Sequence, residues 1–185
     1  MKIVEIKVLR GPNYWSVRRP KLIQMKLDLE ELEQRPTNTI DGFLERLQSL
    51  IPSLYEHRCS EDGPGGFFLR VKEGTWMGHV IEHIALELQT LAGMDCGFGR
   101  TRGTGKEGEY FVVFDYMEDD AGVYAARAAF RVAQALIDAQ EYDLQEDIQS
   151  LREIRENTRL GPSTGSIVEE AVKRGIPFIR LNNKA

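Results

Sequence analysis

Cysteine and histidine are scarce in this chain: its 185 residues include two cysteines and three histidines. Cys59 and Cys96 are too few for a disulfide framework, which excludes the small disulfide-rich secreted class. Basic residues are not in excess either, because 24 Lys and Arg stand against 29 Asp and Glu, a net charge of −5. A nucleic-acid-binding protein normally shows a strongly basic face. We therefore expect no nucleic-acid partner.

Long apolar runs are also missing. No run approaches the roughly 20 residues that span a bilayer, and the Met-Lys-Ile-Val-Glu start lacks the apolar core of a signal peptide. An apolar content of 42% and a charged content of 29% are ordinary for a globular protein. We expect a mildly acidic cytoplasmic domain with no membrane partner.

Periodicity predicts an α+β fold. Alternating apolar residues indicate strands at 2–10 and 22–29, and the apolar run at 110–116 indicates a buried strand. Residues 67–71 are expected to form a further short strand. Helical spacing covers 75–91, 121–139 and 144–158, and Asp41 could cap a helix ending near residue 51. The Gly-rich residues 97–108 favour a loop or hairpin connection. The expected architecture is a mixed or antiparallel sheet with packed helices, the helix at 75–91 bordering a cleft.

A boundary is expected at residues 157–166 (NTRLGPSTGS). After it, residues 167–174 have the pattern of a short helix and residues 176–181 that of a strand start. Such a fragment is too small to fold alone. It either packs on the main domain or begins a second one. We favour the latter, with one domain over residues 1–160 and residues 161–185 beginning the next.

The helix at 75–91 contains the pattern H-V-I-E-H. On a helical wheel, His79 and His83 lie about 40° apart, opposite the apolar face, with Glu82 beside His79. One turn of separation lets both imidazoles reach one ion, and H-x-x-E-H is the inverted form of the zinc-peptidase motif H-E-x-x-H. Glu82 would then be the catalytic general base. A solvated helix face is the alternative. The rarity of the pattern, with Trp76 and Leu86 on the same face, favours a Zn²⁺ site.

A catalytic zinc ion needs a third protein ligand, which the motif does not identify. Cys59 is the first candidate, because it opens a polar loop that could fold over the helix; a small half-buried thiol is the alternative. Glu87 is either a ligand or a carboxylate that bonds a ligating imidazole. His57 and Cys96 are weaker candidates.

Other charged stretches permit binding roles. A phosphate loop is excluded at residues 97–108, because Lys106 is followed by glutamate. Arg100 and Arg102 could meet ligand carboxylates. The remaining candidates have a structural alternative beside a binding one. Glu118 and Asp119 could complement a helix dipole or bind guanidinium groups. Arg18 and Arg19 could belong to a solvated turn or to an edge that binds an acidic chain.

Five stretches resemble the N-terminal domain of cyanophycin synthetase, and the similarity covers nearly the whole chain. They are LRGPNYW (9–15), EGTWMGHVIEHIALELQ (73–89), GFGRTR (97–102), DDAGVYAARAA (119–129) and LGPSTGSIVEEAVKRGIP (160–177). Full-length members of that family continue into ATP-grasp and Mur-ligase-like domains, which use ATP and Mg²⁺ to polymerise Asp and Arg into cyanophycin (multi-L-arginyl-poly-L-aspartate). The resemblance implies that residues 161–185 begin the ATP-grasp domain, that cyanophycin is a partner, and that the full-length enzyme is a homo-oligomer.

The resemblance also gives the histidine motif a substrate. It implies that the domain holds the growing polymer, and a hydrolase there would cut cyanophycin internally into primers. The five motif residues resemble the insulin-degrading-enzyme and pitrilysin peptidases, which implies roles for these side chains only. The polymer carries arginine and carboxylate groups, so the charged residues of both signs named above are expected to bind it. The competing hypotheses are a non-catalytic module that tethers cyanophycin and an architectural role in oligomer assembly.

Overall fold

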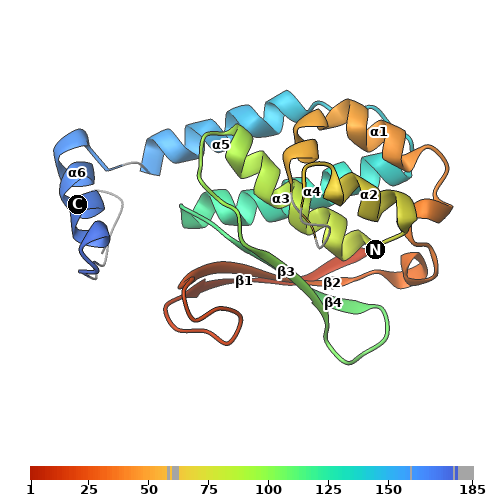
Figure 1. The fold of residues 1–185 in the computed structure, drawn as a ribbon, viewed down its shortest axis with the longest axis horizontal. Helices are drawn as coiled ribbons and strands as arrows, with labels where there is room; N and C mark the ends of the chain where they lie inside the picture. The colour runs from red at the N-terminus through yellow and green to blue at the C-terminus, as the bar shows by residue number, and fades with distance from the viewer. Residues whose placement is uncertain (58, 60–62, 159, 177, 179–185) are drawn as a thin grey trace.

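The computed structural model describes residues 1–57, 59, 63–158, 160–176 and 178, and shows helices layered on one face of a sheet (Figure 1). The sheet is antiparallel throughout, with the strand order β1-β2-β4-β3. Its strands are β1 Lys2–Arg10, β2 Lys21–Asp28, β3 Gly99–Gly103 and β4 Glu109–Asp115. The α-helices are α1 Phe43–Leu50, α2 Gly66–Glu73, α3 Met77–Leu91, α4 Asp119–Ile137, α5 Leu144–Thr158 and α6 Pro162–Lys173. The expected α+β class with an antiparallel sheet is confirmed.

The main core lies between the sheet and the helices. Alternate residues of β2 point toward the helices, and Ile23, Met25 and Leu27 are wholly inaccessible to solvent. Helix α3 packs on β3 and β4, α4 lies beside α3, and α5 packs across both helices. Gly122 lets α4 approach the sheet closely, because a Cβ at this position would lie 2.8 Å from Ile23. Alanines along α4 serve the same close packing.

Three expectations about local structure were wrong in part. Residues 67–71 lie inside helix α2, not in a strand, because Phe67, Phe68 and Val71 share one buried helical face. Five residues are too few to separate the two periods. Helix α1 is preceded by Gly42 in the left-handed conformation, so Asp41 is not its cap. The Gly-rich connection forms a hairpin as expected, but part of it is the edge strand β3.

Helix α6 lies apart from the rest of the fold (Figure 1). None of its residues is buried, and Ile167 and Val172 are exposed. The helix begins five residues before the expected position, at Pro162. The strand expected at 176–181 falls mostly outside the described residues, so the domain boundary stays a prediction. Among the described residues, no helix has the length and apolarity to cross a membrane.

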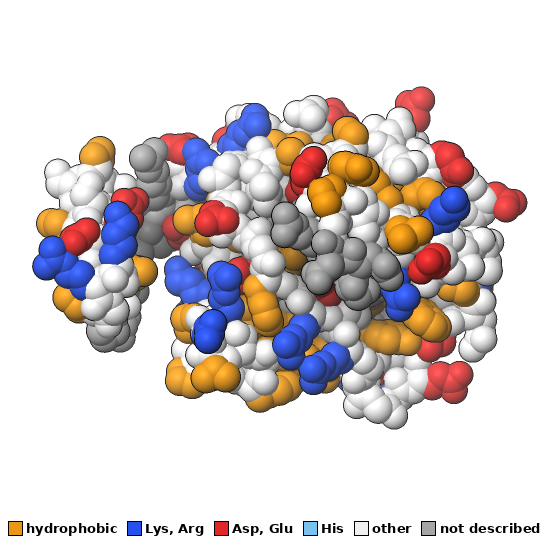
Figure 2. Space-filling model, viewed as in Figure 1, with side chains coloured by type: hydrophobic (Ala, Val, Ile, Leu, Met, Phe, Trp, Pro, Cys, Tyr) orange, Lys and Arg blue, Asp and Glu red, His pale blue; other side chains and the backbone are white. Residues whose placement is uncertain are grey.

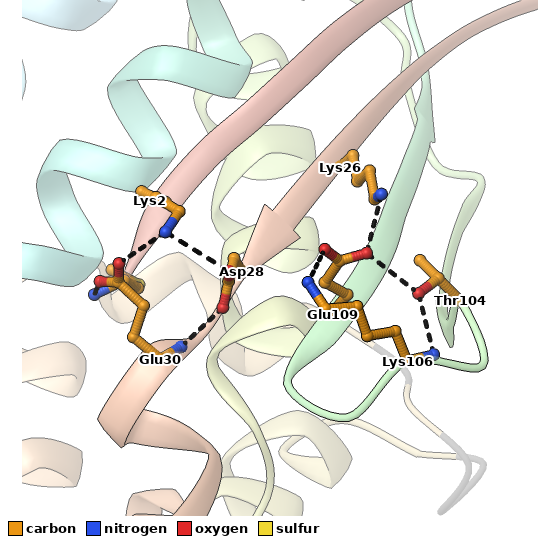
Figure 3. A network of polar contacts seen from close by, with 8 residues as sticks. Lys2, Lys26, Asp28, Glu30, Thr104, Lys106 and Glu109 are labelled. Atoms are coloured by element: carbon orange, nitrogen blue, oxygen red, sulfur yellow. Dashed lines mark hydrogen bonds and ion pairs between the residues drawn. The ribbon is translucent and has the colours of Figure 1, made fainter.

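Ion pairs join the hairpin between β3 and β4 to the neighbouring strand (Figure 3). Glu109 is buried and accepts a hydrogen bond from Lys106. Its Oε2 atom lies 2.7 Å from the Nζ atom of Lys26 on β2. At the same end of the sheet, Lys2 pairs with Asp28 and Glu30. The two lysines hold the pKa of Glu109 at about 2, below the usual 4.5.

Glu109 should make stability depend on pH at the acid end. Its folded pKa lies below the unfolded value, so its contribution is present above about pH 4.5 and is lost as the pH falls toward 2. We expect Glu109→Gln to lower stability at pH 7 and to flatten the loss between pH 4.5 and 2, measured by urea unfolding. The exposed Glu107→Gln in the same hairpin is the control. Parallel pH profiles for the two variants would contradict the assignment.

Candidate metal centre

Helix α3 is covered on both sides. Its apolar face is inaccessible to solvent at Met77, Val80, Ile81, Ile84 and Leu88. The opposite face is covered as well: His83 is 7% exposed and Leu86 5%, while Trp76 at the helix start is 41% exposed. The histidines therefore do not lie on a solvated helix face.

The cover over the histidines comes from α2 and from the short helix η3 (Pro52–Glu56). Phe67 of α2 stacks on His83, with ring centroids 4.1 Å apart, and meets His79 edge-on at 5.7 Å. His57 follows directly after η3, and Cys59 lies two residues further on. The segment before α2 and α2 itself thus meet the middle of α3.

Cys59, His79 and His83 form the one cluster among the described residues whose geometry suits a metal ion. One potential ligand atom from each lies within 4.8 Å of the others. The Nε2 atoms of His79 and His83 are 3.1 Å apart, and Cys59 Sγ is 3.3 Å from His79 Nε2. Ligands of a tetrahedral zinc, at about 2.0–2.3 Å from the ion, lie about 3.3–3.6 Å from each other. The donor set and its spacing fit zinc.

The outward-facing nitrogens of both imidazoles have partners of their own. Thr75 Oγ1 lies 3.1 Å from His79 Nδ1, and His57 Nδ1 lies 3.0 Å from His83 Nδ1. Metal-binding histidines ordinarily bond such a partner through the nitrogen that does not ligate. Burial lowers the pKa of His79 to about 4, with a further decrease from Arg70, and lowers the pKa of His83 well below 6.5. Both rings are therefore neutral at pH 7, as ligation requires.

Glu82 lies at the edge of α3 that faces the sheet. Thr101 Oγ1 on β3 donates a 2.6 Å hydrogen bond to its Oε2. The carboxylate also packs over Gly99, where any Cβ would overlap it. Its oxygens do not belong to the metal-binding cluster. Burial raises the pKa of Glu82 to about 7, although the Thr101 hydrogen bond opposes the shift. A carboxyl group with this pKa can both accept and release a proton near neutral pH.

The other ligand candidates lie differently. Glu87 is 4% exposed, and its Oε2 lies 2.7 Å from His57 Nε2, so it contacts His57 and neither motif histidine. Cys96 follows α3 in the sequence, is buried, and does not belong to the cluster. Burial raises the pKa of its thiol to about 12. Neither described cysteine is part of a disulfide.

The expected substrate-binding residues occupy two places apart from the cluster. Arg100 and Arg102 alternate with Thr101 on β3, so they lie on the face of the sheet opposite the helices. Arg18, Arg19 and Glu118 line a groove of about 1190 Å³ between the sheet end and α6. Arg19 also pairs with Asp115 at 3.1 Å. Asp119 pairs with Arg10 of β1.

Several side chains of the site were not identified from the sequence. Thr75 stands four residues before His79, so helical spacing could have indicated it. Phe67, Gly99 and Thr101 lie on other elements, and nothing in their local sequence connects them to α3. Only the packing of α2 and β3 against α3 brings them together.

Comparisons with known proteins agree on one family. The family model described as cyanophycin synthase-like N-terminal domain matches residues 24–138. A protein of Geminocystis herdmanii named cyanophycin synthetase is 54% identical over 188 residues, covering 100% of this chain and 22% of the relative. Proteins of the same name are 53% identical in Synechocystis sp. (100% of this chain, 22% of the relative) and 54% identical in Trichormus variabilis (98% and 20%). The chain thus spans about a fifth of these relatives.

We expect the chain to bind one Zn²⁺, and Co²⁺ in its place to show a thiolate-to-cobalt charge-transfer band. Cys59→Ala should abolish the band and weaken zinc binding by more than about 100-fold, because outer partners alone contribute about 10- to 100-fold. Chelator competition and absorption spectroscopy measure both effects. Cys96→Ala is the matched control and should retain the band. A band lost in Cys96→Ala and kept in Cys59→Ala would exclude Cys59 as a ligand.

Proposed function

The chain belongs to the cyanophycin synthase-like N-terminal domain family, and we propose that it is a zinc-dependent hydrolase. Its substrate is cyanophycin, the polymer in the name of the relatives. Internal cleavage of this polymer creates new chain ends that can prime synthesis. His79, His83 and Cys59 hold the metal, and Glu82 is the general base.

The arrangement of α3 is the observation that carries this proposal. Two neutral imidazole nitrogens and one thiol sulfur converge, and three such ligands would leave a tetrahedral zinc ion one position for water or substrate. The same helix carries a buried carboxyl group, Glu82, that does not join the cluster and has a pKa of about 7. A purely structural zinc site is closed by four protein ligands and has no use for a base.

Each side chain has a definite part in the proposed reaction. Zinc, when bound, polarises the scissile carbonyl and makes water a better nucleophile. Glu82 takes the proton of the attacking water and delivers it to the leaving nitrogen, so the C–N bond breaks and a carboxylic acid and an amine result. Thr101 holds the Glu82 carboxyl in place through its hydrogen bond, and Gly99 leaves room for it.

The remaining activities belong to the longer protein. On this proposal, the domain adjoins ATP- and Mg²⁺-dependent ligase domains, which start near residue 161 and extend the primers. The exposed, isolated helix α6 supports that boundary. Cytoplasmic location and a homo-oligomeric parent enzyme are part of the same proposal.

Tethering of the polymer is a second candidate function, and the charged surface favours it. Lys and Arg side chains lie along the sheet-bearing part of the molecule among hydrophobic groups (Figure 2). Arg100 and Arg102 are exposed on β3, where Arg100 lies over Phe98 and Arg102 is the cross-strand partner of Phe111. They suit the carboxylates of cyanophycin, whereas Glu118, in the groove near α6, suits its guanidinium groups. Tethering and hydrolysis can operate together.

Replacing the base should separate chemistry from metal binding. We expect Glu82→Gln to slow cyanophycin cleavage by about 10²- to 10⁴-fold, the usual contribution of a general base. Zinc affinity should stay the same, because Glu82 is not a ligand. Product length by gel electrophoresis measures cleavage, and an early fall in chain length would identify internal cuts. Polymer left intact by both proteins with zinc supplied would refute the hydrolase.

Two neighbouring glycines supply a matched pair for the same assay. A Cβ at Gly99 would displace the Glu82 carboxylate, whereas one at Gly97 meets no atom within 4 Å. Gly99→Ala should therefore lose cleavage and Gly97→Ala should keep it. Equal activities would place the reactive carboxyl elsewhere.

The tether makes a prediction of its own. We expect Arg100→Gln and Arg102→Gln each to weaken retention by immobilised cyanophycin about 2- to 5-fold, as for exposed ion pairs worth about 0.5–1 kcal/mol. The effect should shrink as salt is added. The exposed Arg127→Gln on α4 is the control. Retention that falls equally in all three variants would mean that net charge, and not this face of the sheet, binds the polymer.

A further inference from the structure

We propose that His57, held by Glu87, is a positioning residue that fixes the tautomer of His83 and so directs its Nε2 lone pair to the metal. The inference rests on the metal centre of the proposed function and is independent of whether the centre hydrolyses cyanophycin. It assigns roles to two buried or half-buried side chains that the reaction itself does not use.

The chain of hydrogen bonds starts at Glu87. Its Oε2 lies 2.7 Å from His57 Nε2. An ionised carboxylate only accepts hydrogen bonds, so the proton of this contact belongs to His57 Nε2. Glu87 is 4% exposed, which leaves water little part in choosing another arrangement. Glu87 therefore determines which nitrogen of His57 carries the hydrogen.

The second step determines which ring nitrogen of His83 carries the hydrogen. A neutral imidazole with its hydrogen on Nε2 has a lone pair on Nδ1. With His57 in this tautomer, the 3.0 Å contact between the two Nδ1 atoms is a hydrogen bond from His83 to His57. The hydrogen of His83 is thereby placed on Nδ1, and its Nε2 keeps a lone pair. Phe67, stacked on the His83 ring, fixes the plane in which that lone pair points.

The third step concerns the two facing nitrogens. His83 Nε2 lies 3.1 Å from His79 Nε2. Once His83 Nε2 is an acceptor, His79 Nε2 either donates its hydrogen or shares a cation with it. Thr75 can accept from His79 Nδ1, because a hydroxyl oxygen has free lone pairs, and His79 then also presents a lone pair. Two lone pairs at this separation repel each other unless a cation lies between them. This relay of hydrogen bonds, from Glu87 through His57 to His83, thus orients His79 and His83 for a metal ion before the ion binds.

Two other roles for His57 predict different behaviour. It could merely keep the buried Glu87 paired, or it could be a ligand itself. In the variant His57→Gln, the glutamine amide lies near the position of the His57 Nε2 atom and preserves the contact with Glu87. Asparagine places an oxygen near His Nδ1 and preserves the acceptor for His83. The relay needs the acceptor, so His57→Asn should retain more metal affinity than His57→Gln.

Zinc and cobalt binding by the 185-residue chain test the proposal. Chelator competition is run on the parent, His57→Asn, His57→Gln and His57→Phe, at a temperature where circular dichroism shows each to be folded. We expect zinc affinity to fall about 10- to 100-fold in His57→Gln and His57→Phe, the usual effect of losing an outer partner. The fall in His57→Asn should be several-fold smaller. The cobalt spectrum should keep its band positions in all four proteins, because the ligands are unchanged.

The alternative outcomes overturn the proposal in distinct ways. Affinity best preserved in His57→Gln would make His57 a structural partner of Glu87. A cobalt spectrum altered in every variant would make His57 a ligand. Unchanged affinity in His57→Phe would remove it from the centre. If the parent binds zinc and the variants follow the expected order while cyanophycin stays intact, the relay stands and the hydrolase fails.

Discussion

Burial of α3 on both of its sides is the constraint on which the site depends. One side fills the core under the sheet and α4, and the other is closed by α2 and η3. A polar group removed from water must find a partner or change its protonation. Both responses occur here: His83 stays neutral, Glu82 has a pKa of about 7, and each ring nitrogen of His57, His79 and His83 has a neighbour.

The polar residues of α3 are divided between its two edges. Glu82 leans on β3 at the sheet edge, whereas Glu87 reaches His57 at the edge near η3. The two carboxylates are five positions apart on one helix, so they point toward different neighbours. In the proposed site, one exchanges a proton and the other orients a histidine. Their neighbours, not their residue type, decide which is which.

The sheet gives the molecule two unlike faces. The face toward the helices is apolar and supports α3, while the opposite face carries Arg100 and Arg102 around a small apolar cluster that includes Trp15. Thr101, between these arginines, points the other way and reaches Glu82. A five-residue edge strand thus joins the proposed catalytic carboxyl to the charged surface proposed to hold the polymer.

Local periodicity in the sequence was enough to predict β1, β2 and β4, the long helices, and the placing of His79 and His83 one turn apart. It misjudged α2, where five residues fit either period, and left Glu87 with two possible roles. The approach of Cys59 and His57 to the motif histidines, and the hydrogen bond from Thr101 to Glu82, became visible in the folded chain alone. Spacing within one helix is fixed by its 3.6-residue turn. Contacts among residues 57, 59, 75–87 and 99–101 depend on how α2, α3 and β3 pack, and packing is a property of the whole chain.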